Sequence, residues 1–353
     1  MAYTTINKSS DYFNTKLYTG DGSTSHAITG VGFEPSMVWC KNRDGTNSHF
    51  ITDQVRGATK VIHTDTNQVE GTWTNGLISF DSDGFTQSNS GAGNENGQGI
   101  VSWNWKANGQ GSSNTDGSIT ATVSANTTAG FSIIDFTGNE TNSTVGHGLG
   151  VEPSMFIMKR YTDDGYSTST AWYTYHKSLA SNNYLELQST ATVATNDGSL
   201  WNTSTPVTSS VINIGFNANS NHTGNKTIIY AFAEKTGYSK FGSYLGNESS
   251  DGTFIYTGFK PAFFITKCRN TGNTQDWVMK DNRRPGYNQI DDILYPNGNY
   301  AEGHGADVDF LSNGIKIRSA AHNINRGGGN EYIYMAFAEA PLVGSNGVTA
   351  KAR

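Results

Sequence analysis

The chain has 353 residues, enough for two or three domains of ordinary size, each with its own hydrophobic core. Only 15% of the residues are charged, the formal net charge is −6, and lysine and arginine nowhere form a run. Because nucleic-acid binding needs a concentrated basic patch, we expect no nucleic-acid partner. No apolar stretch approaches the ~18 residues of a membrane span, so we also expect no membrane insertion.

The composition favours β-structure. Glycine accounts for 41 residues and aromatic residues for 12% of the chain. Aromatic and β-branched residues favour strands, whereas glycine and small polar residues favour turns. The two cysteines, Cys40 and Cys268, lie far apart and without metal-ligand spacing, so we expect both to be buried free thiols.

One sequence pattern occurs three times in the chain. It reads GFEPSMVWCKNR (32–43), GLGVEPSMFIMKR (148–160) and TGFKPAFFITKCR (257–269). Each proline lies 15 residues after a glycine that follows an aromatic-rich strand. Each copy ends in an alternating strand with one large aromatic residue at the same place, namely Trp105, Phe232 and Phe337. These matches divide the chain into three units, of residues 13–107, 119–236 and 239–341.

In chain order, the first element is the segment of residues 1–12, which we interpret as a docking segment. The piece SDYFNTKLY (10–18) fits either a short helix or a strand. Residues 32–43 of the first unit are apolar at odd and even positions alike, which predicts a central strand covered on both faces, with Pro35 at its start. Asp83 and Gly84 predict a two-residue hairpin turn.

An aspartate and an arginine recur at the same spacing in two units. Asp53 and Arg56 of the first unit correspond to Asp281 and Arg284 of the third, whereas His176 replaces the aspartate in the middle unit. Recurrence inside one chain indicates a structural need of the unit, so we interpret these pairs as a salt-bridged loop that fastens one sheet edge. We assign a structural role also to the three prolines of the repeated pattern, Pro35, Pro153 and Pro261.

Between the first two units, residues 108–118 are rich in glycine, serine and asparagine, which predicts a flexible linker. The first unit is then free to swing unless its surface packs elsewhere. Only residues 237–239 separate the second and third units, so these two must touch. Residues 342–353 form a C-terminal tail.

Each unit combines frequent turn signals with almost no helical periodicity. This pattern is typical of a compact antiparallel β-sandwich, which we favour over a barrel. The predicted fold is therefore all-β, with three tandem antiparallel β-sandwich repeats.

Several segments of the chain have distinctive sequences, among them LYTGDGS (17–23), DQVRGATK (53–60), SFDSDGFT (79–86), VSWNWKANG (101–109) and AFAEAP (336–341). With the three proline patterns they resemble the virion structural proteins of marine tailed bacteriophages, from about residue 3 to Arg353. The resemblance implies a concanavalin-like jelly-roll sandwich, repeated in tandem and displayed on a phage particle. It implies no agreed active site, so no catalytic residue is carried over.

A carbohydrate-active hydrolase is a minor alternative, because the implied fold includes glucanases. Retaining hydrolysis needs two carboxylates that share one face. Asp307 and Asp309 in DVDF (307–310) have that alternation, but we interpret them as solvent-side residues of a strand. We therefore predict a protein that is not an enzyme, with no catalytic residue and no cofactor.

Acidic turns leave a bound Ca²⁺ ion as an alternative. DSDG (81–84) contributes Asp81 and Asp83, and YTDDG (161–165) contributes Asp163 and Asp164. Hairpin turns also favour aspartate and glycine, so we interpret these residues as turn formers. His147 in VGHGLG (145–150) is likewise interpreted as a turn residue.

Four aromatic residues lie in stretches with a loop-like sequence, where a sugar ring could stack on them: Trp73, Trp172, Trp201 and Tyr287. Taken singly, such residues more often pack against their own loop. A host cell-surface glycan as ligand is therefore a hypothesis.

Together these observations predict a virion structural protein of a tailed bacteriophage, in the role of a tail fibre or receptor-binding protein. The alternative role is a capsid-attached decoration or head fibre. We expect other virion proteins as partners and a homo-oligomer, with a trimer favoured because fibres are built on closed symmetric rings. The first twenty residues contain no secretory signal, so we expect folding in the host cytoplasm before assembly into the virion.

Overall fold

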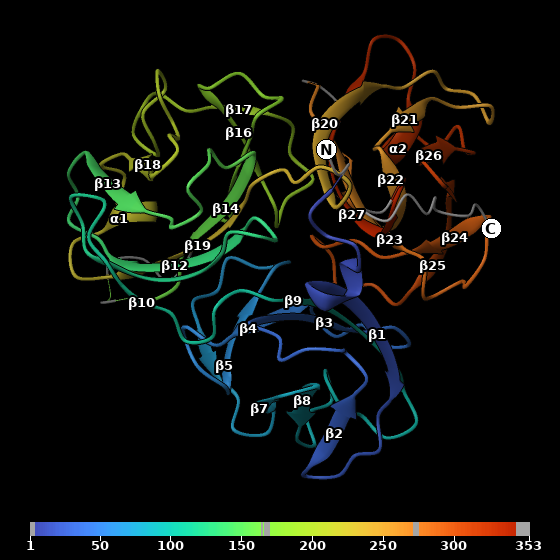
Figure 1. The fold of residues 1–353 in the computed structure, drawn as a ribbon, viewed down its shortest axis with the longest axis horizontal. Helices are drawn as coiled ribbons and strands as arrows, with labels where there is room; N and C mark the ends of the chain where they lie inside the picture. Colours follow the sequence, from blue (N-terminus) through green and yellow to red (C-terminus); the bar gives the residue numbers. More distant parts are fainter. Residues whose placement is uncertain (1–3, 164, 166–169, 271–274, 344–353) are drawn as a thin grey trace.

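The computed structural model describes residues 4–163, 165, 170–270 and 275–343, and nearly all of its regular structure is β-strand (Figure 1). Neighbouring strands pair in antiparallel fashion, so the predicted all-β sandwich fold is confirmed. The only α-helices in these ranges are α1 (Ala218–Asn221) and α2 (His322–Asn325). Within the same ranges, no helix has the length and apolar character needed to cross a bilayer.

The first unit consists of two facing sheets. The large sheet has the order β1 (Phe13–Thr19), β9 (Gly99–Trp105), β3 (Met37–Asn42), β4 (Phe50–Asp53), β5 (Lys60–His63) and β6 (Gly71–Thr72). The small sheet has the order β2 (His26–Thr29), β8 (Gly84–Gln87) and β7 (Leu77–Asp81). Residues of both sheets, including Ile28, Cys40 and Phe85, form one buried cluster between them.

The second unit has a larger main sheet and a smaller second sheet. The main sheet has the order β10 (Ser112–Asn114), β11 (Ala121–Asn126), β12 (Phe131–Thr137), β19 (Lys226–Phe232), β14 (Met155–Arg160), β15 (Tyr173–His176), β16 (Asn183–Glu186) and β17 (Ala194–Thr195). The second sheet has only two strands, β13 (Ser143–Gly146) and β18 (Val211–Ile214).

The third unit pairs two four-stranded sheets. One has the order β20 (Ser239–Leu245), β27 (Glu331–Pro341), β22 (Phe259–Cys268) and β23 (Val278–Asp281). The other has the order β21 (Phe254–Tyr256), β26 (Gly314–Ile317), β25 (Gly303–Leu311) and β24 (Ile290–Ile293). A 3₁₀ helix, η1 (Ser9–Asp11), precedes β1 at the start of the chain, so the ambiguous piece of residues 10–18 contains both a helical turn and a strand.

The strand registers of the three units agree position by position. In the first unit, Met37 lies opposite both Asp53 and Trp105. In the second unit Met155 lies opposite His176 and Phe232, and in the third Phe263 lies opposite Asp281 and Phe337. These agreements support the interpretation of three copies of one unit.

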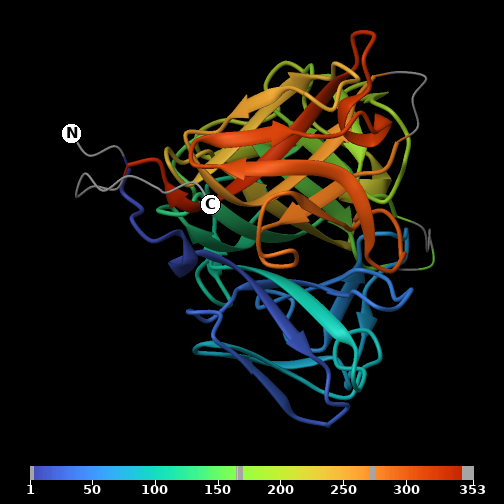
Figure 2. The same ribbon diagram turned by 90° about the vertical axis from the view of Figure 1, so that its right-hand side faces the viewer.

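The large sheets of all three units share one core. On β3, Val38 and Cys40 point into the first unit, whereas Met37 and Trp39 point out of it toward the other units. At the centre the rings of Trp105, Phe232 and Phe337 contact one another, with centroid separations of 5.8 to 6.4 Å. Figure 1 shows the units as three lobes around this centre, and in the turned view of Figure 2 the first unit lies beneath the other two.

The shared core corrects two expectations about mobility. The first unit does not swing, because Trp103 and Trp105 are buried against residues of the other units. The predicted linker is not free either, since β10 lies within it and pairs with β11. In the predicted docking segment, Ile6 is buried in the shared core, so residues 4–11 pack on the body. The predicted tail lies outside the described residues beyond position 343.

The three prolines occupy two kinds of position. Pro35 and Pro153 lie two residues before β3 and β14, at the strand start as predicted. Pro261 lies inside β22, at a β-bulge where the pairing with β27 shifts register. A bulge tolerates proline because the missing N–H does not interrupt a regular ladder. Both cysteines are buried and free, as predicted.

Candidate functional site

The three units meet at three interfaces, which we call seams, and the residues predicted to form a salt-bridged loop lie in two of them. The first seam joins the first and second units. There Arg56 Nε donates to Asp53 Oδ2 at 2.6 Å, and the Tyr230 hydroxyl of the second unit donates to the same oxygen at 2.7 Å. Both charged side chains are buried; burial by itself would lower the pKa of Arg56, but Asp53 and the neighbouring groups, Glu70 among them, together outweigh it, so this pKa is raised.

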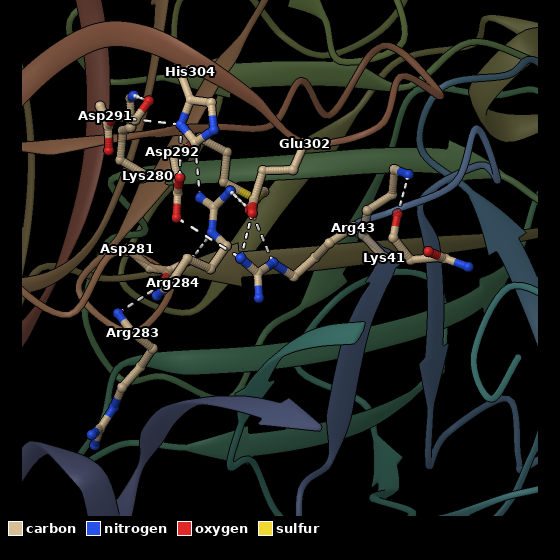
Figure 3. A network of polar contacts seen from close by, with 12 residues as sticks. Lys41, Arg43, Lys280, Asp281, Arg283, Arg284, Asp291, Asp292, Glu302 and His304 are labelled. Atoms are coloured by element: carbon tan, nitrogen blue, oxygen red, sulfur yellow. Dashed lines mark hydrogen bonds and ion pairs between the residues drawn. The ribbon is translucent and has the colours of Figure 1, made fainter. Parts of the chain in front are cut away.

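The seam between the third and first units repeats this arrangement, and Figure 3 shows its charged residues. Arg284 Nε donates to Asp281 Oδ2 at 2.6 Å, and the indole Nε1 of Trp103, from the first unit, donates to the same oxygen at 3.1 Å. Arg284 also donates to Glu302 at 2.8 Å, and Arg43 of the first unit binds Glu302 from the other side. As in the first seam, the aspartate thus accepts hydrogen bonds from an arginine of its own unit and from an aromatic side chain of another unit.

The seam between the second and third units uses different residues. His176 stands where the other seams have aspartate, and its Nε2 donates to the backbone carbonyl of Tyr334 at 3.1 Å. Leu179 stands at the position of the arginine, and Met335 at the position of Trp103 and Tyr230. Burial lowers the pKa of His176 to about 4, so the imidazole is neutral at physiological pH. An acid with neither a basic nor a side-chain donor partner would be costly here, which explains the histidine.

The interpretation of these residues therefore needs one correction. The salt bridges of Asp53 with Arg56 and of Asp281 with Arg284 are buried and each lies within one unit, but both aspartates also accept a hydrogen bond from another unit, so these loops lie in the seams. Their partners Tyr230 and Trp103 belong to other units, so no spacing along the chain revealed them.

Two of the predicted sugar-stacking residues are fully buried, so that interpretation is wrong for them. Trp172 lies in the shared core, and its Nε1 donates to the carbonyl of His63 across the first seam at 2.7 Å. Trp201 lies in the core of the second unit, with its ring 5.2 Å from that of Phe156. Trp277 was not identified from the sequence. Its Nε1 donates to the Glu186 carbonyl at 3.0 Å, a hydrogen bond across the seam between the second and third units.

The other two predicted aromatic residues are accessible to different degrees. Trp73 is half-buried and packs on Phe50 and His63, with ring centroids 5.6 and 5.1 Å away. Tyr287 is 75% exposed. Only Tyr287 therefore offers most of its ring to a ligand.

The aspartates of the first acidic turn accept hydrogen bonds within the first unit. Asp81 accepts hydrogen bonds from Ser79 and Thr86, and Asp83 accepts from the backbone amides of Gly30 and Gly32. Those amide contacts lower the pKa of Asp83. Both aspartates therefore have hydrogen-bond partners beside the turn between β7 and β8.

Asp163 of the second acidic turn and His147 both accept hydrogen bonds from nearby backbone amides. Asp163 accepts from the amide of Gly165, and Asp164 lies outside the described residues. His147 is buried in its turn, where its Nδ1 accepts from the amide of Leu149 at 3.1 Å.

Among the described residues, one group of three side chains could hold a metal ion: Asp291, Asp292 and His304, whose ligand atoms lie within 4.8 Å of one another. Arg43 lies 3.9 Å from Asp292, and Lys280 donates to the backbone carbonyl of Asp291 at 2.9 Å (Figure 3). Basic side chains thus already face the group, and we interpret it as an extension of the seam between the third and first units.

The two carboxylates considered for hydrolysis lie on one face of β25. Asp307 and Asp309 alternate with buried residues along the strand, and Arg318 donates to Asp309 at 2.6 Å. This agrees with their interpretation as residues on the solvent side of a strand.

A further cleft lies on the outer side of the second unit. It has a volume of about 480 Å³ and runs between the sheet of β13 and β18 and the loop of residues 196–206. Phe216, just beyond β18, lines it and is 55% exposed. No residue predicted from the sequence lines this cleft.

The protein is all-β, and its sandwiches surround a shared core. At the seams the sandwiches contact one another through buried polar side chains. The family described as "Domain of unknown function (DUF7483)" matches residues 8–341, and the chain belongs to that family. The match runs through all three units as one stretch. No curated protein matches the chain.

Proposed function

We propose that this protein is a non-enzymatic virion structural protein of a tailed bacteriophage, in the role of a tail fibre or receptor-binding component. The proposal starts from the resemblance of the repeated blocks to virion proteins of marine tailed phages. The observation that carries it furthest is the arrangement of the chain ends on a rigid three-lobed body.

The first and last described segments lie together. A Cβ atom placed on Gly237 would lie 3.0 Å from Cβ of Thr4 and 3.3 Å from Cβ of Pro341. Both segments therefore pass the connection between the second and third units. A protein attached through this region would hold all three sandwiches away from its attachment point, which suits a displayed component.

The seams supply the rigidity that display requires. Buried salt bridges lie at the seams, hydrogen bonds from Tyr230, Trp103 and Trp172 cross from one unit to the next, and the central aromatic rings fill the space between the units. This stability needs no disulfide, since both cysteines are free. Such a body can fold in a reducing host cytoplasm before assembly.

We propose other virion proteins as partners, a host surface glycan as ligand, and a homo-oligomer on the particle. The faces that a trimer of single sandwiches would bury are already buried within one chain. Contacts between copies would therefore use the outer surfaces of the lobes.

Electron microscopy of intact virions with gold-labelled antibodies against the purified protein tests the proposal. Label on the tail supports the favoured role, and label on the head supports the alternative of a capsid decoration or head fibre. Virions that carry no label, while the free protein is detected in the lysate, would contradict a place on the particle.

A further inference from the structure

The cleft of the second unit exists because a strand is interrupted there. In the first unit β7 pairs with β8 as a third strand of the small sheet. In the second unit the corresponding chain forms no continuous strand and pairs with β18 at two isolated bridges, Trp201 with Ile214 and Val207 with Ile212. Residues 202–206 bulge out between these bridges, and the space beside them is the cleft.

The walls of the cleft are fixed by hydrogen bonds. The side-chain oxygen of Asn202 accepts from the amides of Ser204 and Thr205, both at 2.9 Å. The side-chain amide of Asn213, on β18, donates to the carbonyl of Thr205 at 2.7 Å. Trp201 is fully buried beneath the loop. The cleft is therefore largely formed before any ligand arrives, which lowers the entropy cost of binding.

The lining is polar and almost uncharged. Most of its side chains carry an amide or a hydroxyl group, including Asn142, Thr144, Thr203 and Asn213, and Asp197 is its one charged residue. The lining contains no cation to attract a phosphate or sulfate, and too little apolar surface for a lipid or a drug-like molecule. Many neutral donors and acceptors suit a ligand with many hydroxyl groups.

Phe216 adds an aromatic surface at the edge of this polar lining. The ring is 55% exposed. The residue two positions beyond the corresponding strand is Asn89 in the first unit and Ser319 in the third. The aromatic residue is therefore a feature of the second unit alone, like the interrupted strand beside it.

We propose that this cleft binds a neutral oligosaccharide, with the apolar face of one sugar ring on Phe216 and the hydroxyl groups on the neighbouring amides and hydroxyls. A sugar ring has both an apolar face and a rim of hydroxyl groups, and this lining offers a partner to each. The inference deepens the proposed adhesion role and rests on it for the source of the sugar, a host cell surface.

The test is binding of the purified full chain to a defined panel. Saturation-transfer NMR and isothermal titration calorimetry would use maltotriose, cellotriose, laminaritriose, chitotriose and neutral oligosaccharides released from the host envelope, with sialyllactose as an anionic comparison. We expect at least one neutral oligosaccharide to bind. Phe216→Ala should weaken that binding about tenfold, through loss of the stacking surface.

Phe254→Ala is the matched control. Phe254 is also an exposed phenylalanine, at 42%, but it lies on β21 of the third unit. We expect this variant to bind as the unchanged protein does, and both variants to keep its unfolding temperature. Asn142→Ala removes an exposed amide from the lining of the cleft, just before β13, and should also weaken binding.

Three results would overturn the inference: no neutral oligosaccharide binds, only sialyllactose binds, or Phe216→Ala binds as tightly as the unchanged protein. These results are separate from the virion labelling. A protein on the tail that binds no sugar would remove the cleft proposal alone, whereas sugar binding by a protein absent from virions would remove the proposed function alone.

Discussion

The hydroxyl of Tyr230 donates to a carboxylate oxygen of Asp53 at 2.7 Å, although the two residues are 177 positions apart in the chain. Each belongs to a different unit, and both are buried. The contact joins the units through one shared oxygen, which Arg56 also binds. Its counterpart in the seam between the third and first units is the hydrogen bond from Trp103 to the oxygen of Asp281 that Arg284 also binds.

The first prediction concerns these donors. Tyr230→Phe leaves the buried Asp53 with one partner fewer, and we expect a loss of about 1.5–3 kcal/mol in the free energy of unfolding. Trp103→Phe should have a similar effect through Asp281. Urea unfolding measures both, with Tyr256→Phe as an exposed control that should change stability by less than about 0.5 kcal/mol. A loss no larger than in the control would mean that the shared oxygen does not stabilise the seam.

The second prediction concerns His176, which replaces the aspartate in the seam between the second and third units. His176→Asp places a carboxylate where Leu179 and Met335 offer neither charge nor hydrogen bond, so we expect a loss of about 3–5 kcal/mol. His176→Gln keeps a side-chain donor for the Tyr334 carbonyl and should cost less. The two variants are compared by denaturant unfolding at neutral pH. Equal stability of the aspartate and glutamine variants would contradict the explanation given for this histidine.

The third prediction is that the units unfold together. Because one core contains residues of all three, calorimetry should show a single transition with equal calorimetric and van't Hoff enthalpies. Trp105→Ala removes a central ring and should lower stability by about 3–5 kcal/mol without splitting the transition. A separate early transition of the first unit would show that the shared core does not couple the units.

A fourth prediction follows from buried lysines. Three lie six residues after the repeated prolines, namely Lys41, Lys159 and Lys267. Each ammonium group donates to backbone carbonyls, for example that of Thr170 at 2.6 Å from Lys159, and Lys159 also donates to the Thr170 hydroxyl. Burial lowers the pKa of Lys159 and of Lys280 to about 7, and that of Lys41 and Lys267 to about 8.

The sign of the pH dependence is set by the unfolded chain, in which lysine keeps its proton up to about pH 10.4. Between pH 7 and that value the unfolded state binds more protons, so stability should rise with pH, by at most about 1.4 kcal/mol per pH unit for each lysine. The pKa of Cys40, which burial raises to about 12, opposes the rise above about pH 8.5. Unfolding temperatures from pH 7 to 9 measure the effect, and Lys159→Met should flatten the slope. A slope that is unchanged in this variant would contradict the assignment.

Local pattern was enough to predict the strands. The repeated proline stretches are buried on both faces, as their unbroken apolar sequence indicated. The pattern could not say what covers the second face, because other units cover it and their placement depends on contacts far apart in the chain. Trp172 shows the consequence: it follows a loop and looks accessible, yet it lies under the first unit.

Some signals in the sequence were nevertheless available. The middle unit changes His176 and Leu179 together, and the third unit has Met335 where the others have an aromatic donor. These changes at matching positions point to one contact between units. Another triple match concerns three buried asparagines that accept a hydrogen bond from the residue after a repeated glycine, namely Asn94, Asn221 and Asn325. The cleft had no such signal, because it arises from an interruption found in one unit only.

The covalent connection of the three lobes has an evolutionary consequence. In a ring of identical subunits, every mutation appears at all three interfaces at once, and a change that suits one position must be tolerated at the others. Here each junction has its own codons, so one lobe can acquire a specialised surface while its neighbours keep the architecture intact. A chain of this kind can break its own symmetry without dismantling it.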